Sequence, residues 1–535
     1  MIAALAAWYL IPSPTLALPW AVVFAGLAWR WPRRALALAP LTFPFWFAPL
    51  HVTGRLVFPL SELTLALLTL VAAAQAGPRL ARASSRRLNR MGRAYLARLG
   101  GPVALGAGLL LAGMTAGVLI AREPHVALRA WRWEIAEPLV YAALVVWRLR
   151  GRWLWQTLWA FVASGVMVAA LALAQATLAH ITFAPLGAGG GLVPYPAWNG
   201  PGWRATAIIY GSPNSAGAWM ARTLPLALAV ALWPRAAKRG ERLLAGLAAA
   251  ALLAGLALTG SRGAWLGAAA GAVVVGALAA IVARRRISER ANAFAPEGSA
   301  AHNARLRGRG IAPARLLAIT LAAALVYATS AFWLAPFVGL SGGAHGGSGE
   351  VRLLVWRAAE AMARDHPLLG VGPDQFLYSY DPRYTAHPYL IATLDGRPTA
   401  AAREPNLSHP HNLGLELWLS AGLAGLVGYM LALVAAVGRS LTPCPRSPQK
   451  AGQQGARAHG WRAILWLGGL ERGWRGAAVA GVMGALAAGL AHGLVDSAYF
   501  QPDFALAFWW GVAALIALGR APNPRPEAPP TSARS

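Results

Sequence analysis

Charged residues, acids and cysteines are all scarce in this sequence. Only 13% of its 535 residues are charged, whereas about a quarter is usual for a soluble domain. The chain holds 19 acids against 48 Lys and Arg residues, and a single cysteine, Cys444. One thiol can form neither an internal disulfide nor a CxxC metal site. The composition therefore argues against a soluble fold and against redox or zinc–thiolate chemistry.

Long apolar runs are abundant, since 57% of the residues are hydrophobic. A helix needs about 20 apolar residues to cross a hydrocarbon core of about 30 Å. The candidate runs are residues 14–30, 35–51, 57–77, 102–121, 133–149, 155–180, 217–233, 242–260, 263–283, 315–336, 411–438, 474–494 and 501–519. Short runs such as 35–51 are weak candidates. We predict an all-α, polytopic integral membrane protein with about 12–14 transmembrane helices.

Most of the positive charge lies in alternate loops between these runs. The net charge of +29 would suggest a nucleic-acid partner in a soluble protein. The basic segments are residues 30–34, 79–98, 148–152, 235–242, 284–315, 439–475 and the tail after Gly519. Their alternation follows the positive-inside rule, so we assign them to the cytoplasm and expect no nucleic-acid partner. The N-terminus lacks the basic segment of a cleaved signal peptide and is expected to remain in the mature chain.

The spans and loops divide the chain into five parts. Transmembrane helices are expected in residues 1–200 and again in residues 201–336. Residues 337–410 form one large loop on the outer face, periplasmic or extracellular. Residues 411–520 hold the C-terminal transmembrane helices, and residues 521–535 form a disordered cytoplasmic tail.

The large loop contains a helical pattern, EVRLLVWRAAEAMARDHP. One of its faces is apolar and another is charged. The apolar stripe consists of Val351, Leu354, Val355, Ala358 and Met362, and the charged face of Arg357, Glu360 and Arg364. We expect an interfacial helix that lies on the membrane.

Thirteen arginines fall on or near the outer face, where the positive-inside bias disfavours them. They are Arg55, Arg122, Arg129, Arg132, Arg204, Arg222, Arg262, Arg352, Arg357, Arg364, Arg383, Arg397 and Arg403. Phosphate binding is one reason for their presence, because the guanidinium fork matches phosphate geometry.

Two outer turns carry such arginines. In LTGSRGAWLG, Arg262 stands in a tight turn between two spans. It either anchors the turn at the lipid headgroups or meets an anionic partner. In GWRATAIIYGSPNSAGAWMARTLP, Ser212 or Asn214 has the chemistry to cap the following helix. Arg204 and Arg222 bracket that turn, and Arg204 is the better candidate for a functional role.

The stretch SHPHNLGLELWLSAGLAG joins the large loop to an apolar span. Asn412 or His411 can cap the helix. A metal site would use His409, His411 and a loop acid, but no further ligand stands at a recognisable spacing, so no metal is expected. As a third alternative, His411 serves as a general base, since a neutral imidazole accepts a hydroxyl proton.

A second histidine lies near the end of the last but one span. His492 and Asp496 are four residues apart, and therefore on one helical face. The pair either orients another group or pairs with itself. We expect a supporting structural role.

Three of these stretches resemble the O-antigen ligase and Wzy-type polymerase superfamily of bacterial cell-surface glycan enzymes. SRGAWLG, at Ser261–Gly267, resembles the family's Ser-Arg-Gly turn. RLLVWRAAEAMARDHPLLGVGPDQF, at Arg352–Phe376, resembles its large-loop signature. HNLGLELWLSAGLAG, at His411–Gly425, fits a ligase pattern of His, Asn, nine residues, Gly, two residues and a small residue. The motifs occur in order on one predicted face, and spacing and topology agree over roughly residues 200–500.

The resemblance implies a GT-C-like fold and an inverting glycosyl transfer without metal or cofactor, at the outer face of the bacterial inner membrane. The donor would be a glycan on undecaprenyl diphosphate. The acceptor would be a sugar hydroxyl, on lipid A–core for a ligase or on another lipid-linked glycan for a Wzy-type polymerase. We prefer the ligase, although both branches use the same residues. No clear aspartate stands where the related peptidoglycan polymerases carry theirs, which argues against that branch.

The resemblance also assigns roles to residues. His411 would take the acceptor's proton, and Arg262 and Arg352 would stabilise the leaving lipid diphosphate. The large-loop arginine of the family corresponds to Arg352 or Arg357, and the spacing to Trp356 favours Arg352. The predicted substrate-binding residues are Arg204, Arg357, Asn412 and Asn214.

Two other classes of protein are weaker alternatives. A lipid-linked glycan transporter would show internal repeats and ionisable residues near the bilayer midplane. Here the midplanes of the apolar runs are nearly free of charge, except for Glu62 and Glu137, and the polar groups gather at one face. A non-catalytic scaffold would not need His411 and the arginines to converge.

Overall fold

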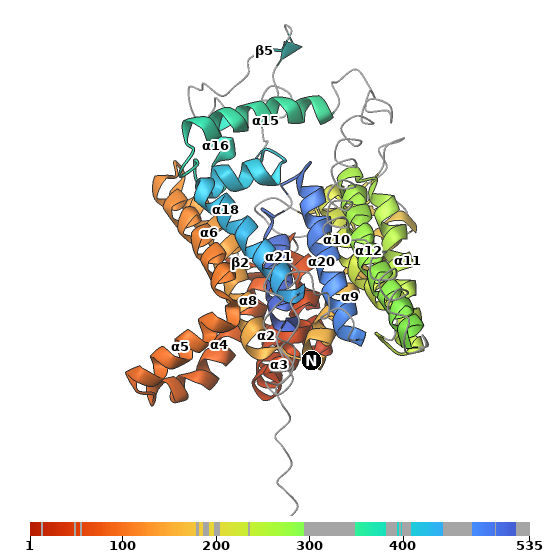
Figure 1. Cartoon of the computed structure of the whole chain (residues 1–535). Coiled ribbons are helices and arrows are strands. Elements are labelled where there is room, and N and C mark those ends of the chain that lie inside the picture. The colour runs from red at the N-terminus through yellow and green to blue at the C-terminus, as the bar shows by residue number, and fades with distance from the viewer. Residues whose placement is uncertain are drawn as a thin grey trace, which may run out of the picture.

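The chain is almost wholly helical wherever the structure, a computed structural model, describes it (Figure 1). The described residues are 1–11, 14–47, 50–53, 56–177, 181–185, 192–196, 204–233, 236–293, 348–380, 393–394, 397–398, 408–441, 473–497 and 499–519. Strands form three short antiparallel pairs in these parts. They are β1 (Leu50–Thr53) with β2 (Leu56–Phe58), β3 (Ile181–Pro185) with β4 (Leu192–Pro196), and β5 (Thr393–Leu394) with β6 (Arg397–Pro398).

Eight helices in the described residues are long and apolar enough to cross a membrane. They are α4 (Leu60–Ala81), α6 (Gly101–Ile120), α9 (Arg152–Thr177), α10 (Pro213–Leu232), α11 (Arg239–Thr259), α12 (Arg262–Ala293), α18 (Leu413–Leu441) and α20 (Gly473–Gly493). Two shorter apolar helices join them, α2 (Pro14–Arg30) and α21 (Pro502–Leu518). The predicted fold class, an all-α polytopic membrane protein, is confirmed.

The remaining helices are short or lie at the ends of the bundle. They are α1 (Ile2–Leu10), α3 (Pro32–Leu38), the 3₁₀ helix η1 (Ala39–Phe47), α5 (Ser85–Leu99), α7 (Pro124–Trp131), the π-helix η2 (Arg132–Ala136), α8 (Glu137–Arg148), α15 (Ser348–Asp365) and α16 (Phe376–Tyr380).

Not every predicted span forms one helix. The span predicted at 35–51 is wrong, because α3 gives way to the 3₁₀ helix η1 and then to β1. Pro40 and Pro44 lack the N–H groups that an α-helix needs there. The run at 133–149 is divided between η2 and α8. The run at 315–336 lies outside the described residues.

Small residues let the long helices approach one another closely. A β carbon on Gly106 of α6 would lie 2.5 Å from the backbone oxygen of Gly428 on α18. A β carbon on Gly271 of α12 would lie 2.8 Å from the backbone oxygen of Gly484 on α20. Such contacts are the usual means of helix association in lipid, where burying apolar surface gives little driving force.

Aromatic side chains fill the space at the centre of the bundle. The buried Trp219 of α10 packs beside Phe161 of α9, with ring centroids 5.9 Å apart, and beside Phe504 of α21, at 6.0 Å. Its indole nitrogen donates to Ser164 Oγ at 3.2 Å. Helix α10 is therefore enclosed on several sides, and its polar N-terminal turn is held in a fixed position.

Helix α18 is broken at Gly422, whose φ of 66° lies in the left-handed region. The break frees backbone groups that the helix would otherwise use. The Leu419 carbonyl accepts from the N–H of Val371 at 2.7 Å and of Gly372 at 3.0 Å, and the Leu423 N–H donates to the Pro367 carbonyl at 3.2 Å. The large loop is thus joined to α18 itself, at the break in its first third.

Helix α15 lies across one end of the bundle (Figure 1). We expected its apolar stripe to lie on the membrane. Instead Val355, Ala358 and Met362 are buried against other parts of the protein, in a cluster that includes Phe376 of α16 and Leu419 of α18. These three side chains form the apolar face that the sequence predicts. The face packs on protein because the hydrogen bonds at the Gly422 break hold the loop against the bundle.

The basic α5 lies at the opposite end of the molecule from α15 (Figure 1). This arrangement agrees with the assignment of the segment 79–98 and the loop 337–410 to opposite faces of a membrane.

We predict that Gly422→Ala destabilises the protein by about 1–3 kcal/mol or more. A β carbon at this position would lie 1.9 Å from the Leu368 carbonyl oxygen, on a backbone that already has positive φ. Thermal unfolding of the detergent-solubilised protein measures the effect. The matched control is Gly438→Ala in the same helix, where a β carbon meets nothing within 4 Å. Equal unfolding temperatures for the two variants would contradict this account of the break.

Candidate active site

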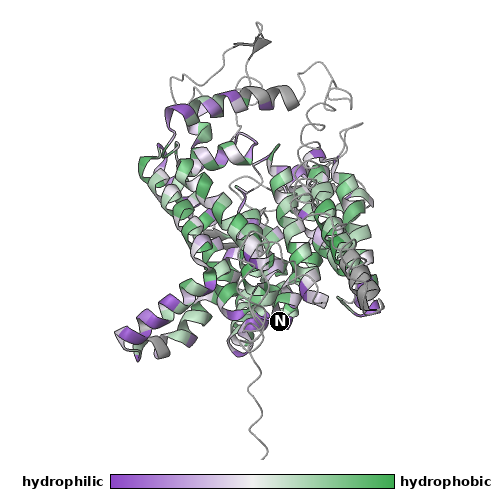
Figure 2. Ribbon diagram, viewed as in Figure 1, coloured by the Kyte–Doolittle hydropathy of each residue, from purple (hydrophilic) through white to green (hydrophobic). Residues whose placement is uncertain are grey.

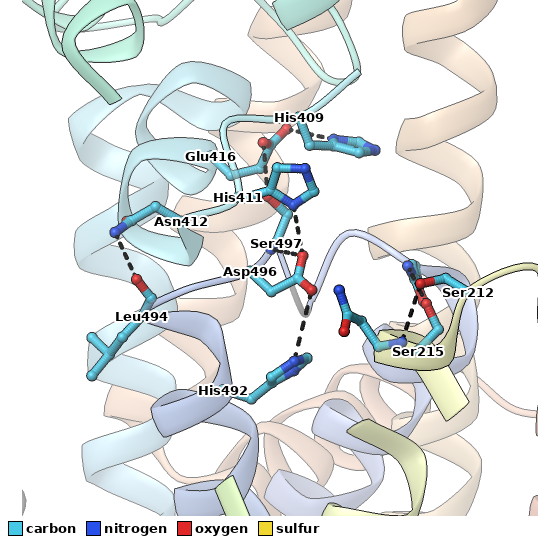
Figure 3. Close-up of polar contacts among 12 residues, drawn as sticks. Ser212, Ser215, His409, His411, Asn412, Glu416, His492, Leu494, Asp496 and Ser497 are labelled. Carbon is cyan, nitrogen blue, oxygen red and sulfur yellow. Dashed lines mark hydrogen bonds and ion pairs between the residues drawn. The ribbon is translucent and has the colours of Figure 1, made fainter. Parts of the chain in front are cut away.

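The ends of four long helices meet at the end of the bundle that α15 covers. Helices α10, α12 and α18 begin there, and α20 ends there. Gly263 of α12 abuts His492 of α20, because a β carbon on this glycine would lie 2.7 Å from His492 Cδ2. Gly493 likewise abuts Leu413 of α18, at 2.9 Å. Side chains from distant parts of the sequence therefore share one polar region, part of which is drawn in Figure 3.

Asp496 lies between two imidazoles at the centre of this region (Figure 3). Its Oδ1 is 2.9 Å from His411 Nδ1, and its Oδ2 is 3.7 Å from His492 Nε2. The Ser497 N–H also donates to Oδ1, at 2.8 Å. A carboxylate at Nδ1 selects the His411 tautomer that has its proton on Nδ1 and a lone pair on Nε2. His411 has a side-chain exposure of 32%, so the ring is accessible to a ligand.

The charge of Asp496 is maintained by its neighbours. Burial alone raises the pKa of its carboxyl group. The hydrogen bond from His411 and the electrostatic interactions with His492, His411 and Arg352 outweigh burial and hold that pKa well below its usual range. Asp496 is therefore held as an anion, and its carboxylate orients His411.

The backbone of His411 has an unusual conformation, and its neighbour is bonded on both sides. His411 has a φ of 51°, a conformation that is uncommon for a residue other than glycine. The next residue, Asn412, caps α18 by accepting the Leu415 N–H at 3.1 Å, and its amide nitrogen donates to the Leu494 carbonyl at 3.3 Å. The predicted cap is confirmed. Both ends of the Asn412 amide are thus bonded within the protein, next to the strained His411 that they help to place.

A second histidine–carboxylate pair stands beside the first. His409 Nδ1 is 3.2 Å from Oε1 of the buried Glu416, and the Ser497 hydroxyl donates to Glu416 Oε2 at 3.3 Å. Burial alone lowers the pKa of His409. The carboxylate of Glu416, with smaller contributions from Asp374 and Glu134, outweighs burial and raises that pKa to about 9. Through Ser497, this pair supports the segment that carries Asp496.

The two histidines of the H-x-H pattern thus use different carboxylates. The described residues contain no cluster of three His, Cys, Asp or Glu side chains arranged as a metal site requires. His409 and His411 are instead the ends of one hydrogen-bonded network that runs through Glu416, Ser497 and Asp496.

Two of the predicted arginines, Arg262 and Arg352, lie within electrostatic reach of a third, Arg204. Arg204 precedes α10, Arg262 is the first residue of α12, and Arg352 is on α15. Partial burial lowers the pKa of Arg204, and the charges of Arg262 and Arg352 lower it further. Arg352 also acts on Asp496, so the cluster and the His411–Asp496 pair occupy the same region. Cations gathered in this way repel one another, which favours an anionic partner.

Hydrogen bonds to the protein hold Arg204 in place. Its Nε donates to the Thr259 carbonyl at 2.7 Å, and its Nη2 donates to Asn214 Oδ1 at 2.7 Å. Asn214 is therefore a residue that positions Arg204. The cap of α10 is Ser212, whose hydroxyl accepts the Asn214 N–H at 3.2 Å.

Arg262 stands at the N-terminus of α12, next to the tight turn predicted from the sequence. Gly260 takes the left-handed conformation there, and Ser261 caps the helix by accepting the Ala264 N–H at 3.3 Å. A helix N-terminus carries partial positive charge, so an exposed arginine is electrostatically unfavourable there unless an anion is bound.

Two other arginines are placed differently from Arg204, Arg262 and Arg352. Arg357 is on the exposed face of α15, away from the buried stripe. Arg222 is inside α10, with its guanidinium carbon 4.0 Å from the centre of the Phe504 ring. Arg222 and the buried Asp503 are therefore ionisable groups inside the bundle, in addition to Glu62 and Glu137.

Several of the outer arginines have protein partners. Arg129 lies 3.5 Å from Asp374, Arg132 lies 3.0 Å from Glu62, and Arg364 pairs with Glu360. Arg122 donates to the Tyr378 carbonyl at 3.4 Å. For Arg122, Arg129 and Arg132, attachment of the large loop or of neighbouring helices explains the position without a phosphate. Arg364 instead pairs with an exposed acid one turn earlier on its own helix. Arg55, Arg383 and Arg403 lie outside the described residues.

Sequence reasoning missed Glu416, although it is the one acid in the apolar run of α18, and that isolation was a usable signal. Asp496 was singled out with His492, as a pair that either orients another group or pairs with itself. Its shorter contact is to His411, 85 residues away in the sequence. No local pattern reports a contact across that separation.

Fold and site together define a polytopic membrane protein with an arginine-rich polar site at one end of its helical bundle. A family model described as O-antigen ligase matches residues 247–430, which include Arg262, Arg352 and His411. The resemblance to the O-antigen ligase and Wzy-type superfamily is thereby confirmed for this stretch. No curated protein matches the chain.

We predict that the protein loses stability as the pH rises through about 9. His409 has a folded-state pKa of about 9, above its ordinary value of about 6.5. Its contribution is therefore complete below about pH 6.5 and disappears as the proton leaves. Unfolding temperatures measured from pH 6 to 10 test this. His409→Gln should flatten the profile, whereas His366→Gln, at an exposed histidine of the same loop, should leave it unchanged.

Proposed function

We propose that this protein is an O-antigen ligase-like glycosyltransferase of the bacterial inner membrane. It moves a glycan from undecaprenyl diphosphate to a sugar hydroxyl on lipid A–core or a similar acceptor, at the outer, periplasmic face. The observation that carries the proposal is the convergence of Arg204, Arg262 and Arg352 beside the His411–Asp496 pair. The family match to an O-antigen ligase over residues 247–430 supports the same class of reaction.

In the proposed reaction His411 is the general base. With Nδ1 bonded to Asp496, Nε2 is the nitrogen that accepts the hydroxyl proton of the acceptor. The acceptor oxygen then forms a bond to the anomeric carbon as the bond from that carbon to the diphosphate oxygen breaks. Attack from the side opposite the leaving group inverts the anomeric configuration. Asp496 stabilises the imidazolium that results, as a carboxylate does in other His–Asp pairs.

The arginines stabilise the leaving group in this proposal. When the glycosidic bond breaks, its electron pair remains on the lipid diphosphate, which becomes more negative. Three guanidinium groups fixed in advance stabilise that charge without the cost of reorganising solvent. No metal ion is required for this step, since the arginines supply the positive charge. Asn214 and Asn412 contribute indirectly, by holding Arg204 and the His411 turn.

Electrostatic repulsion among the three arginines in the absence of a ligand favours the reaction. Part of the diphosphate's binding energy relieves that repulsion. The site then favours the most negative species along the reaction path, which is the state in which the glycosidic bond is breaking.

We predict that His411→Ala abolishes glycan transfer while the protein remains folded in the membrane. Asp496→Asn should lower kcat on the order of a hundredfold or more, since the amide no longer stabilises the imidazolium. The assay offers purified undecaprenyl-diphosphate glycan together with lipid A–core and a second lipid-linked glycan as competing acceptors. Product on lipid A–core supports the ligase, whereas elongation of the lipid-linked glycan identifies a Wzy-type polymerase. Full activity of His411→Ala would show that His411 is not the general base and is only part of the turn that caps α18.

Two of the arginines of α15, Arg352 and Arg357, provide a matched pair of variants. We predict that Arg352→Gln lowers transfer at least about tenfold, because it removes a cation that faces the site. Arg357→Gln, on the exposed face of the same helix, should retain most of the activity. Transfer rates at saturating acceptor and varied donor distinguish the two. A larger loss in Arg357→Gln would reassign the loop arginine.

A further inference from the structure

Five arginines form an exposed basic patch at the end of the molecule opposite the candidate site. They are Arg82 near the end of α4 and Arg86, Arg87, Arg90 and Arg93 on α5. None of the five makes an ion pair with any carboxylate of the described residues. Along the chain, the nearest acids are Glu62 and Glu123. The patch therefore has positive charge that the described part of the protein does not neutralise.

The charge is confined to one side of α5. Successive residues of an α-helix are about 100° apart. The positions of Arg86, Arg87, Arg90 and Arg93 consequently fall within about a third of the helix circumference. Met91, Tyr95 and Leu99 fall on the other side. Figure 2 shows the hydrophilic residues that colour much of this helix. The helix is thus strongly amphipathic, as interfacial helices are.

Contacts with the bundle fix the orientation of α5. The Tyr95 hydroxyl donates to the Ala143 carbonyl of α8 at 3.3 Å, and Leu99 packs on the core. One glycine, Gly100, with a φ of 86°, separates α5 from the transmembrane helix α6. The C-terminal end of α5 is therefore held where α6 enters the membrane. Met91, with 46% exposure, and Leu96, with 55%, leave apolar surface beyond this anchored end.

We propose that α5 is a binding surface for the headgroups of anionic phospholipids, on the membrane face where α6 begins. A lipid surface offers phosphate groups to the arginines and apolar chains to Met91 and Leu96, whereas a soluble polyanion offers only the charge. Basic residues held near an anionic leaflet are each attracted to it, and their effects accumulate. The helix therefore lies flat on the membrane, and it distinguishes anionic from neutral lipid. This inference is independent of the proposed glycosyl transfer.

The test uses the full-length protein in nanodiscs. One set contains phosphatidylcholine alone, and the other contains phosphatidylcholine with one third phosphatidylglycerol. Hydrogen–deuterium exchange is measured on peptides from residues 85–99. In the anionic discs we expect the amides of α5 to exchange more slowly, on the order of tenfold. High salt should remove the difference, because the Debye length falls to about 3 Å at 1 M.

Two variants separate the lipid site from a general effect of charge. Replacing Arg86, Arg87, Arg90 and Arg93 together by Gln should abolish the difference between the two lipids. Arg150→Gln with Arg152→Gln, in another basic loop, should preserve it. Circular dichroism and the unfolding temperature establish that each variant is folded. If the quadruple variant does not fold, Arg90→Gln with Arg93→Gln should halve the effect or more.

Three results would overturn the proposal. The first is equal exchange of α5 in neutral and anionic discs. The second is equal protection of wild type and the quadruple variant in anionic discs. The third is full protection in neutral discs on adding inorganic phosphate, which would identify a site for free phosphate instead of a lipid surface.

Discussion

The break in α18 at Gly422 is the constraint on which the arrangement of this protein depends. A regular helix would keep the Leu419 carbonyl and the Leu423 N–H to itself. At the break these groups bond residues 367–372, so the large loop is attached to the bundle through backbone hydrogen bonds. The same attachment places α15, and with it Arg352, over the helix ends that carry His411 and Asp496. The loop is thereby made part of the site.

Repulsion is the second feature that shapes the site. Three arginines approach one another near a membrane surface, where water screens charge less than in bulk solvent. Each is held there by backbone structure. Arg204 is bonded to the end of α11 and the start of α10, Arg262 begins α12, and Arg352 follows from the attachment of α15. The places of these residues at helix ends and on α15 bring the cations together despite their repulsion, and side-chain hydrogen bonds hold Arg204.

The two histidine–carboxylate pairs have different roles in the site. Asp496 orients His411, the histidine that a ligand can reach. Glu416 holds His409 and, through Ser497, the segment on which Asp496 stands. An acid buried in an apolar helix is costly unless it is hydrogen-bonded, and Glu416 meets that condition on both of its oxygens. For the basic α5, far from this network, we propose a different role for charge, the binding of anionic headgroups.

The sequence alone determined the class of protein, the positions of most long helices and the candidates His411, Arg204, Arg262 and Arg352. These inferences rest on local properties: apolar runs of membrane length, charge in alternate loops and short motifs with a fixed spacing. It also narrowed each cap to two residues, of which Ser212 and Asn412 are the ones that accept N–H groups two or three positions away. Only the tertiary structure showed that Asp496 belongs to His411, that Glu416 and Ser497 join the two pairs, and that the stripe of α15 packs on protein. Those facts depend on contacts between residues far apart in the chain, and such contacts are set by how the helices pack.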